Sequence, residues 1–269
     1  MRISVMTYSL AQQGGYTVED YVRHIAASGA EGINWVTTYG QSAKDLRQMS
    51  LDASLEVSCY TFPLLTIAQT GGDWRAEAQA ELDAAAALGA PRVMVVPMKP
   101  RGIDDLSENR RLWLEVLEGM HPWAQERQIV LTIENFQGAG SAFVTSDELA
   151  AARQALPWLR FTYDAGNAAT GDEAPAHGPR LLGDAIEFVH FKDYFRDKAV
   201  AGDPRTLHGR DGHLYTPAVL GEGDLGLEEA LAALKAVGYD GWLDVEYEGA
   251  EPPAHEAIAA GVRWYKERI

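Results

Sequence analysis

The sequence predicts a closed (β/α)8 barrel, in which eight parallel strands alternate with helices around a shared core. Short runs rich in β-branched and aromatic residues alternate with stretches of helical periodicity along the 269 residues, and eight such runs are present. The runs are almost continuously apolar, which indicates burial on both faces and therefore a parallel sheet. Eight strand–helix units in about 250 residues fit a closed barrel better than an open doubly wound sheet.

The expected elements follow one another in a regular order. The strands are residues 3–8, 32–36, 55–60, 92–97, 129–134, 159–163, 188–191 and 242–246. Apolar residues recur at the spacing of one helix face in the segments 74–86, 112–123 and 227–234. These three segments are therefore predicted to be helices that cover the barrel.

Boundary residues support the same order of elements. Thr145 and Glu148 form a capping box at the start of a helix that Pro157 ends. Glycines, for which a left-handed helix end costs little, stand just past three other helical patterns: Gly29, Gly89 and Gly238. With no linker in view, we expect residues 1–269 to form one domain. A segment at about 196–224, rich in Gly, Pro, Asp and His, is expected to be a long loop on the active-site side.

Composition limits the classes of function. The apolar content of 46% suffices for a large core, and the net charge of −16 disfavours nucleic acid and anionic membranes as partners. Cys59 is the single cysteine and excludes an intrachain disulfide, so we expect it to be a buried thiol. Neither a secretory signal nor an apolar run long enough to span a membrane is present, and we expect a cytoplasmic protein. Homo-oligomerisation is compatible with the sequence but leaves no readable signal in it.

Four expected strands end on a residue that can bind a metal: Glu134, Asp164, His190 and Glu246. Because the carboxyl ends of parallel barrel strands open onto one face, we expect these four side chains to converge on one ion. Each alone has a simpler explanation, such as a helix cap or a core histidine. Together, three carboxylates and one imidazole suit Mn²⁺ or Mg²⁺ and also admit Co²⁺ or Zn²⁺.

Further polar residues near these strand ends are candidates for substrate binding. Lys192 lies two residues after His190 and should share its side of the strand, although a salt bridge to a nearby carboxylate explains it equally well. The other candidates follow the ligand strands or lie in the expected loop: Asn135, Asn167, Arg196, His208 and His213.

Several motifs resemble the sugar phosphate isomerase/epimerase family, the xylose isomerase-like TIM barrels. They are Ile-Glu-Asn at 133–135, Tyr-Asp-Ala-Gly-Asn at 163–167, His-Phe-Lys-Asp at 190–193, Gly-Glu-Gly-Asp at 221–224 and Gly-Tyr-Asp-Gly-Trp-Leu-Asp-Val-Glu at 238–246. The resemblance covers essentially the whole chain. It implies that Glu134, Asp164, His190 and Glu246 hold one divalent metal and that the two glutamates act as acid and base. Many members carry a substrate-contacting His where this chain has Asn167.

The chemistry also follows from the residues. A divalent ion on a substrate carbonyl and its neighbouring hydroxyl acidifies the α-hydrogen, so that a carboxylate can remove it and leave a metal-stabilised enediolate. Return of the proton gives a sugar, keto-sugar or cyclitol isomerase or epimerase. Loss of a β-substituent instead gives a dehydratase or lyase, for which His208 or His213 would supply an acid. A non-catalytic sugar-binding protein is a weaker alternative. A zinc endonuclease would require more histidine ligands at the strand ends and a basic groove, and the sequence predicts neither.

Overall fold

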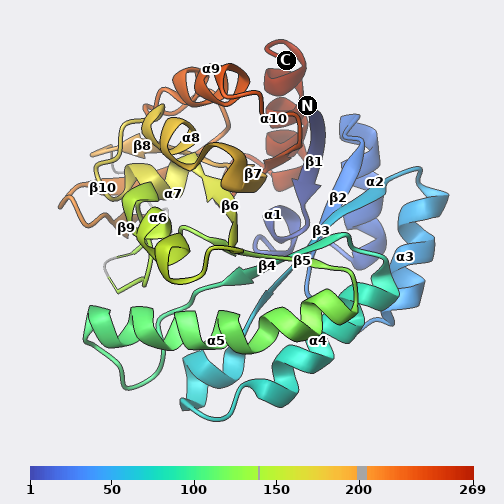
Figure 1. Ribbon diagram of the computed structural model, residues 1–269. Helices are drawn as coiled ribbons and strands as arrows, with labels where there is room; N and C mark the ends of the chain where they lie inside the picture. The colour runs from blue at the N-terminus through green and yellow to red at the C-terminus, as the bar shows by residue number, and fades with distance from the viewer. Residues whose placement is uncertain (139, 199–204) are drawn as a thin grey trace.

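Eight parallel strands close into a barrel in the order β1-β11-β7-β6-β5-β4-β3-β2, which confirms the predicted (β/α)8 fold (Figure 1). The structure is a computed structural model and describes residues 1–138, 140–198 and 205–269. The barrel strands are β1 (Arg2–Met6), β2 (Gly32–Val36), β3 (Glu56–Pro63), β4 (Arg92–Val96), β5 (Val130–Glu134), β6 (Arg160–Asp164), β7 (Ile186–Phe191) and β11 (Trp242–Val245). Each of them overlaps a strand expected from the sequence.

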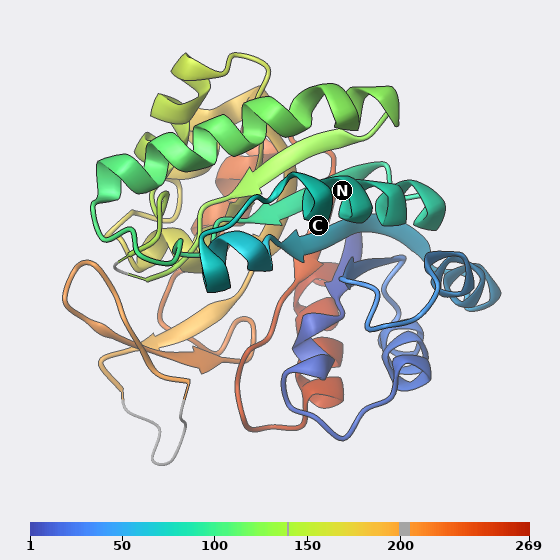
Figure 2. The same cartoon turned by 90° about the horizontal axis from the view of Figure 1, so that it is seen from below.

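Helices between the strands cover the outside of the barrel, as Figures 1 and 2 show. They are α1 (Tyr8–Ala11), α2 (Val18–Ser28), α3 (Ala43–Asp52), α4 (Arg75–Leu88), α5 (Leu106–Glu126), α6 (Ser146–Ala155), α7 (Ala165–Ala169), α8 (His177–Leu182), α9 (Leu227–Ala236) and α10 (Ala254–Lys266). A π-helix, η1 (Thr66–Thr70), follows β3, and a 3₁₀ turn, η2 (Gly183–Ala185), precedes β7.

The predicted helix ends are confirmed by backbone geometry. Glu148 accepts a hydrogen bond from the backbone N–H of Thr145 at 3.1 Å, which completes the capping box of α6. Gly29 and Gly89 end α2 and α4 with φ angles of 80° and 81°. A second capping box, between Thr17 and Asp20 at the start of α2, was not predicted.

Two groups of apolar side chains stabilise the barrel. The larger fills the space between strands and helices and includes Trp35, Trp113 and Phe161. The smaller lies inside the barrel and consists of Met6, Cys59, Met94, Phe188 and Trp242. Cys59 is fully buried, as expected, and burial raises the pKa of its thiol to about 12.

The segment expected to be a long loop instead contains a small antiparallel sheet. Its strands are β8 (Asp193–Arg196), β9 (Leu207–His208) and β10 (Leu214–Ala218), in the order β8-β10-β9. Figure 2 shows this sheet beside the barrel at the lower left. The expectation of an irregular segment was wrong because two to five residues are too few to show strand alternation among Gly, Pro and Asp. Residues 199–204 of the segment lie outside the described part of the chain.

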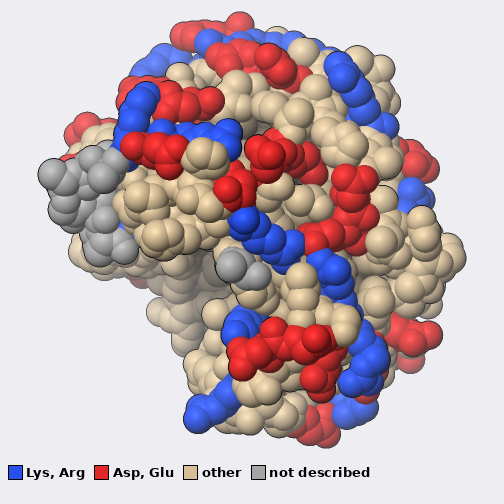
Figure 3. Space-filling view, turned by 90° about the vertical axis from the view of Figure 1, so that its left-hand side faces the viewer, with Lys and Arg blue, Asp and Glu red and all other residues tan. Residues whose placement is uncertain are grey.

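The surface carries charges of both signs. On the face drawn in Figure 3, Lys and Arg are interspersed with Asp and Glu rather than gathered in one basic area. No helix within the described ranges is both long enough and apolar enough to cross a membrane.

Candidate metal centre

The four predicted ligands come together at the carboxyl ends of their strands. Glu134 and Asp164 are the last residues of β5 and β6, His190 lies near the end of β7, and Glu246 directly follows β11. One donor atom from each lies within 4.8 Å of the others. His190 Nδ1 lies 2.8 Å from Glu134 Oε1 and 3.3 Å from Glu246 Oε2. The convergence expected from the strand ends is therefore present in the structure.

Burial and close spacing shift the pKa values of carboxylates in this cluster. All four residues are buried, and burial raises the pKa of Asp164 well above its usual range, with the charges of Glu134 and Glu246 adding to the rise. Burial also opposes ionisation of Glu246, but the Lys192 ammonium and the His190 ring outweigh it and lower that pKa. Three carboxylates and the His190 ring thus share a small buried volume beside the Lys192 ammonium.

The donor set fits a divalent cation. Asp164 Oδ2 and Glu246 Oε2 are buried oxygens without a hydrogen bond, although the Lys192 ammonium lies 3.9 Å from the first and the His190 ring 3.3 Å from the second. Buried oxygens of this kind are costly, and a bound cation would satisfy both. Three carboxylates with one imidazole are ligands that Mn²⁺, Mg²⁺, Co²⁺ and Zn²⁺ accept. Glu134, Asp164, His190 and Glu246 would hold such an ion.

Lys192 lies beside the cluster, as its position after His190 predicted. Its Nζ donates to Glu246 Oε1 at 2.9 Å and to Glu248 Oε1 at 3.4 Å, and lies 3.9 Å from Asp164 Oδ2. Glu248 was missed in the sequence, although its spacing of two from Glu246 resembles that of Lys192 from His190. Burial, followed by the Glu246 charge, raises the pKa of Glu248 to about 7 despite the opposing Lys192 ammonium.

Asp244 is a second residue that sequence reasoning missed. It lies two residues before Glu246 on β11, is fully buried, and places Oδ2 3.5 Å from His190 Nε2. Ser4 donates to its other oxygen, and Asn34 Nδ2 donates to Oδ2 at 3.0 Å. When His190 binds a cation through Nδ1, its Nε2 carries the proton. This N–H can then donate a hydrogen bond to the Asp244 carboxylate.

Replacing Asp244 with Asn should therefore weaken metal binding without touching a ligand. We expect roughly a 10–100-fold loss of Mn²⁺ affinity, measured by calorimetry, because the uncharged amide holds the His190 ring less firmly. Ser4→Ala, which keeps the Asp244 carboxylate but removes one donor, should cost much less. An unchanged affinity in Asp244→Asn would show that His190 needs no such support.

The two asparagines proposed for substrate binding instead form hydrogen bonds to the backbone at the ends of β5 and β6. Asn135 Nδ2 donates to the Asp164 carbonyl at 2.8 Å, and its Oδ1 accepts from the Asp164 N–H at 2.9 Å. Asn167 Nδ2 donates to the Asn135 carbonyl at 2.9 Å. Both are fully buried, and neither is among the residues that line the cavity. Both asparagines therefore support the backbone around Asp164 and do not face the cavity.

Three candidates from the segment after β7 also lie away from the cavity. Arg196 pairs with Asp211 at 3.1 Å, His213 Nδ1 lies 2.5 Å from Asp197 Oδ2, and His208 is exposed in β9. None of the three lines the cavity. The same segment instead contributes Arg205, which donates to the Glu248 carbonyl at 3.1 Å.

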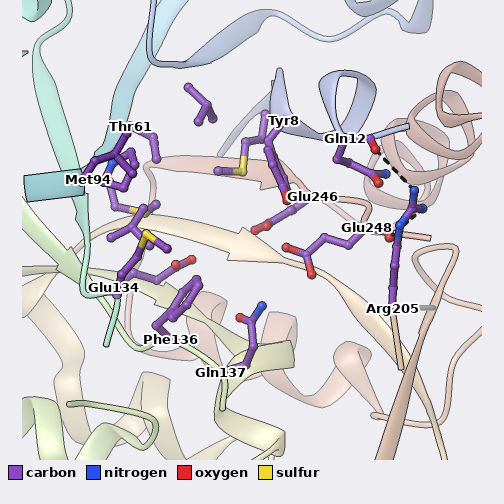
Figure 4. A pocket seen from close by; sticks show the side chains of 16 residues that line it. Tyr8, Gln12, Thr61, Met94, Glu134, Phe136, Gln137, Arg205, Glu246 and Glu248 are labelled. Atoms are coloured by element: carbon purple, nitrogen blue, oxygen red, sulfur yellow. Dashed lines mark hydrogen bonds between the residues drawn. The ribbon is translucent and has the colours of Figure 1, made fainter. Parts of the chain in front are cut away.

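A cavity of about 460 Å³ opens above the cluster, and Glu134, Glu246 and Glu248 line it. This volume falls within the range of roughly 300–1,000 Å³ that is usual for small-molecule sites. Figure 4 shows Glu246 and Glu248 pointing into the cavity, with Gln12 and Arg205 at one end and Met94 and Thr61 at the other.

Comparisons with known proteins agree with this architecture. The family model described as xylose isomerase-like TIM barrel matches residues 22–268. None of the curated proteins is similar enough in sequence to match the chain.

Solved structures share the fold at low sequence identity. D-allulose 3-epimerase from Methylomonas sp., in complex with D-allulose, has a TM-score of 0.77 and 13% identity, covering 100% of this chain and 97% of its own. D-psicose 3-epimerase from Clostridium cellulolyticum H10, with D-tagatose, has a TM-score of 0.77 and 11% identity, covering 99% and 98%. The IOLI protein with a bound zinc atom has a TM-score of 0.76 and 15% identity, covering 99% and 97%.

Proposed function

Because the chain belongs to the xylose isomerase-like TIM barrel family, we propose that it is a divalent-metal-dependent isomerase or epimerase of a sugar, keto-sugar or cyclitol. The observation that carries this proposal is the convergence of Glu134, Asp164, His190 and Glu246 on one buried point at the edge of a cavity. A divalent ion bound there would polarise a substrate carbonyl and its neighbouring hydroxyl, which acidifies the hydrogen on the α-carbon.

In this proposal the two glutamates move that hydrogen. Glu134 and Glu246 both line the cavity, and strands β6 and β7 separate their strands in the barrel, so the two carboxylates reach the substrate site from different strands. One carboxylate removes the α-proton to give an enediolate, and the other returns a proton. Return to the opposite face of the same carbon gives epimerisation, whereas return to the adjacent carbon gives isomerisation.

Lys192 has a defined part in this scheme. Its bond to Glu246 Oε1 holds the carboxylate in one orientation and leaves Oε2, which has no hydrogen-bond partner, directed toward the cluster. The ammonium also favours the ionised carboxylate, which is the form that accepts a proton.

The solved neighbours support the substrate class. Two are named as ketose 3-epimerases and were determined with D-allulose or D-tagatose, and one was determined with zinc. An elimination would need a further acid over the leaving group, and the two histidines considered for that role, His208 and His213, do not line the cavity. This favours isomerisation or epimerisation over the lyase alternative.

Deuterium exchange tests the proposal directly. Ketoses, aldoses and inososes are incubated in D₂O with Mn²⁺-loaded enzyme, which is removed before proton NMR. We expect deuterium at the carbon next to the carbonyl together with a new isomer or epimer, loss of both after treatment with EDTA, and recovery when Mn²⁺ is restored. Loss of water or of a substituent would assign the protein to the lyases, and no exchange with any compound would favour a binding protein.

A further inference from the structure

The cavity that contains the two glutamates has a second side with a different chemistry. Six apolar residues line it, and we call them the apolar wall: Met6, Val36, Met94, Val96, Met98 and Phe136. Three of the six are methionines, whose thioethers make favourable contacts with aromatic rings. The wall therefore offers few partners for the hydroxyl groups of a sugar.

The apolar wall occupies the same structural level as the metal ligands. Met6, Val36 and Val96 are the last residues of β1, β2 and β4, just as Glu134 and Asp164 are the last residues of β5 and β6. The ends of β5 and β6 thus carry ligands, while the ends of β1, β2 and β4 carry apolar side chains, and Phe136 of the wall lies beside Glu134 (Figure 4). Both sets of residues border the same cavity, so a substrate held at the ligands would face the apolar side chains.

The wall is firmly supported from below. Met6 and Met94 are 5% and 0% exposed and belong to the cluster inside the barrel, against which Val36 and Val96 also pack. A surface held in this way keeps its shape when a ligand binds, so little side-chain ordering opposes binding.

The apolar surface also continues outward to solvent. Tyr8 and Leu65 line the cavity and are 40% and 42% exposed, so apolar surface reaches its mouth. Leu65 directly precedes the π-helix η1, a rare element that occurs frequently at functional sites. The mouth therefore leaves room for a group larger than the reacting part of the substrate.

From this arrangement we propose that the substrate carries an uncharged aromatic substituent that binds on the apolar wall, while its α-hydroxy-ketone end lies at Glu134 and Glu246. This inference rests on the proposed function and specifies its substrate class. The remaining polar lining residues, among them Thr61, Gln12 and Gln137, suffice for the hydroxyls near the reacting carbons. An anionic substituent is disfavoured on the apolar wall because Glu134, Glu246 and Glu248 line the cavity, and the cation Arg205 lies at the end away from Met94 (Figure 4).

A matched pair of chelators separates the two ends of the ligand. Acetohydroxamate binds a divalent ion through two oxygens, as an α-hydroxy-ketone does, and phenylacetohydroxamate differs only by its phenyl ring. Titration calorimetry with Mn²⁺-loaded enzyme should give at least about tenfold tighter binding for the phenyl compound, since the ring loses its contact with water on the wall.

Variants locate the gain on the wall. Met98 is half-buried and follows β4, so Met98→Gln should fold and should remove most of the gain, as should the near-isosteric Val96→Thr. Met49→Gln is the matched control, because Met49 lies on α3 and packs against the outer core, away from the cavity. It should leave the gain unchanged.

The results distinguish failure of this inference from failure of the proposed function. Equal binding of the two hydroxamates would overturn the inference, and so would a gain in affinity that survives in both wall variants. The wall would then contact the carbon-bound hydrogens of an unsubstituted sugar or a side chain of a second copy of the protein. If neither compound binds and the protein takes up no Mn²⁺, the metal centre itself is wrong and both proposals fall.

Discussion

Glu246→Gln should abolish exchange of the substrate's α-hydrogen while the fold stays intact. Gln has the size of Glu and keeps an oxygen that can accept from Lys192, but it has no carboxylate to remove or return a proton. General acid–base catalysis contributes about 10²–10⁴-fold to a rate, so the D₂O exchange assay should show a loss of at least that size. Far-ultraviolet circular dichroism and the unfolding temperature should stay close to those of the wild type.

A matched control removes a glutamate from the opposite end of the barrel. Glu187 lies on β7, the strand that carries His190, and pairs with Arg92 at 3.2 Å and Arg160 at 3.4 Å. Glu187→Gln should retain the exchange rate even if it lowers stability slightly. Full activity in Glu246→Gln would refute its role as acid or base, and equal losses in the two variants would point to a general effect of removing a charge.

The strand ends explain why so much of the fold and the metal centre followed from the sequence. Parallel strands buried on both faces leave continuous apolar runs, and each run stops where the chain meets the cavity. A residue such as Asp164 or His190 at that point is conspicuous because its neighbours are apolar. Since the barrel aligns all carboxyl ends, positions along the chain translate directly into proximity in space.

Residues that act through other residues could not be found in this way. Asp244 lies inside the otherwise apolar strand β11, and its role depends on Ser4 and Asn34, which come from β1 and β2, far away in the sequence but close in the barrel. Likewise, the bond from Lys192 to Glu246 rather than to Glu134 depends on the order of strands around the barrel. Such contacts depend on three-dimensional register, which local patterns do not encode.

The asparagines illustrate a different limit. Asn135 and Asn167 follow ligand strands and carry groups suited to sugar hydroxyls, yet their amides bond to backbone atoms around Asp164. A side chain at a strand end can turn into the cavity or back onto the chain, and nothing in the sequence fixes that choice. The apolar wall was equally hidden, because apolar strand ends look like ordinary core.

Asp164→Asn should remove the metal and preserve the helix cap, which separates the two explanations that the sequence left open for this residue. Asp164 Oδ1 accepts from the N–H of Asn167 at 2.7 Å and caps α7, whereas Oδ2 has no hydrogen-bond partner. Asn keeps an acceptor for the cap but loses the charge that a cation needs. After loading with Mn²⁺ and desalting, elemental analysis should show metal near one equivalent in the wild type and a small fraction in the variant.

The stability of the metal-free protein provides an independent readout of the same change. Because the pKa of Asp164 is raised well above its usual range, its ionised form is disfavoured in the folded state, where it is buried beside Glu134 and Glu246. A neutral Asn relieves that cost, so metal-free Asp164→Asn should unfold at a temperature equal to or above that of the metal-free wild type. Asp164→Ala loses the cap as well and should unfold at a lower temperature than Asp164→Asn, by an amount corresponding to about 1 kcal/mol. A full equivalent of Mn²⁺ in Asp164→Asn would show that Asp164 acts as a helix cap and not as a ligand. The cation would then have to bind through the other three residues.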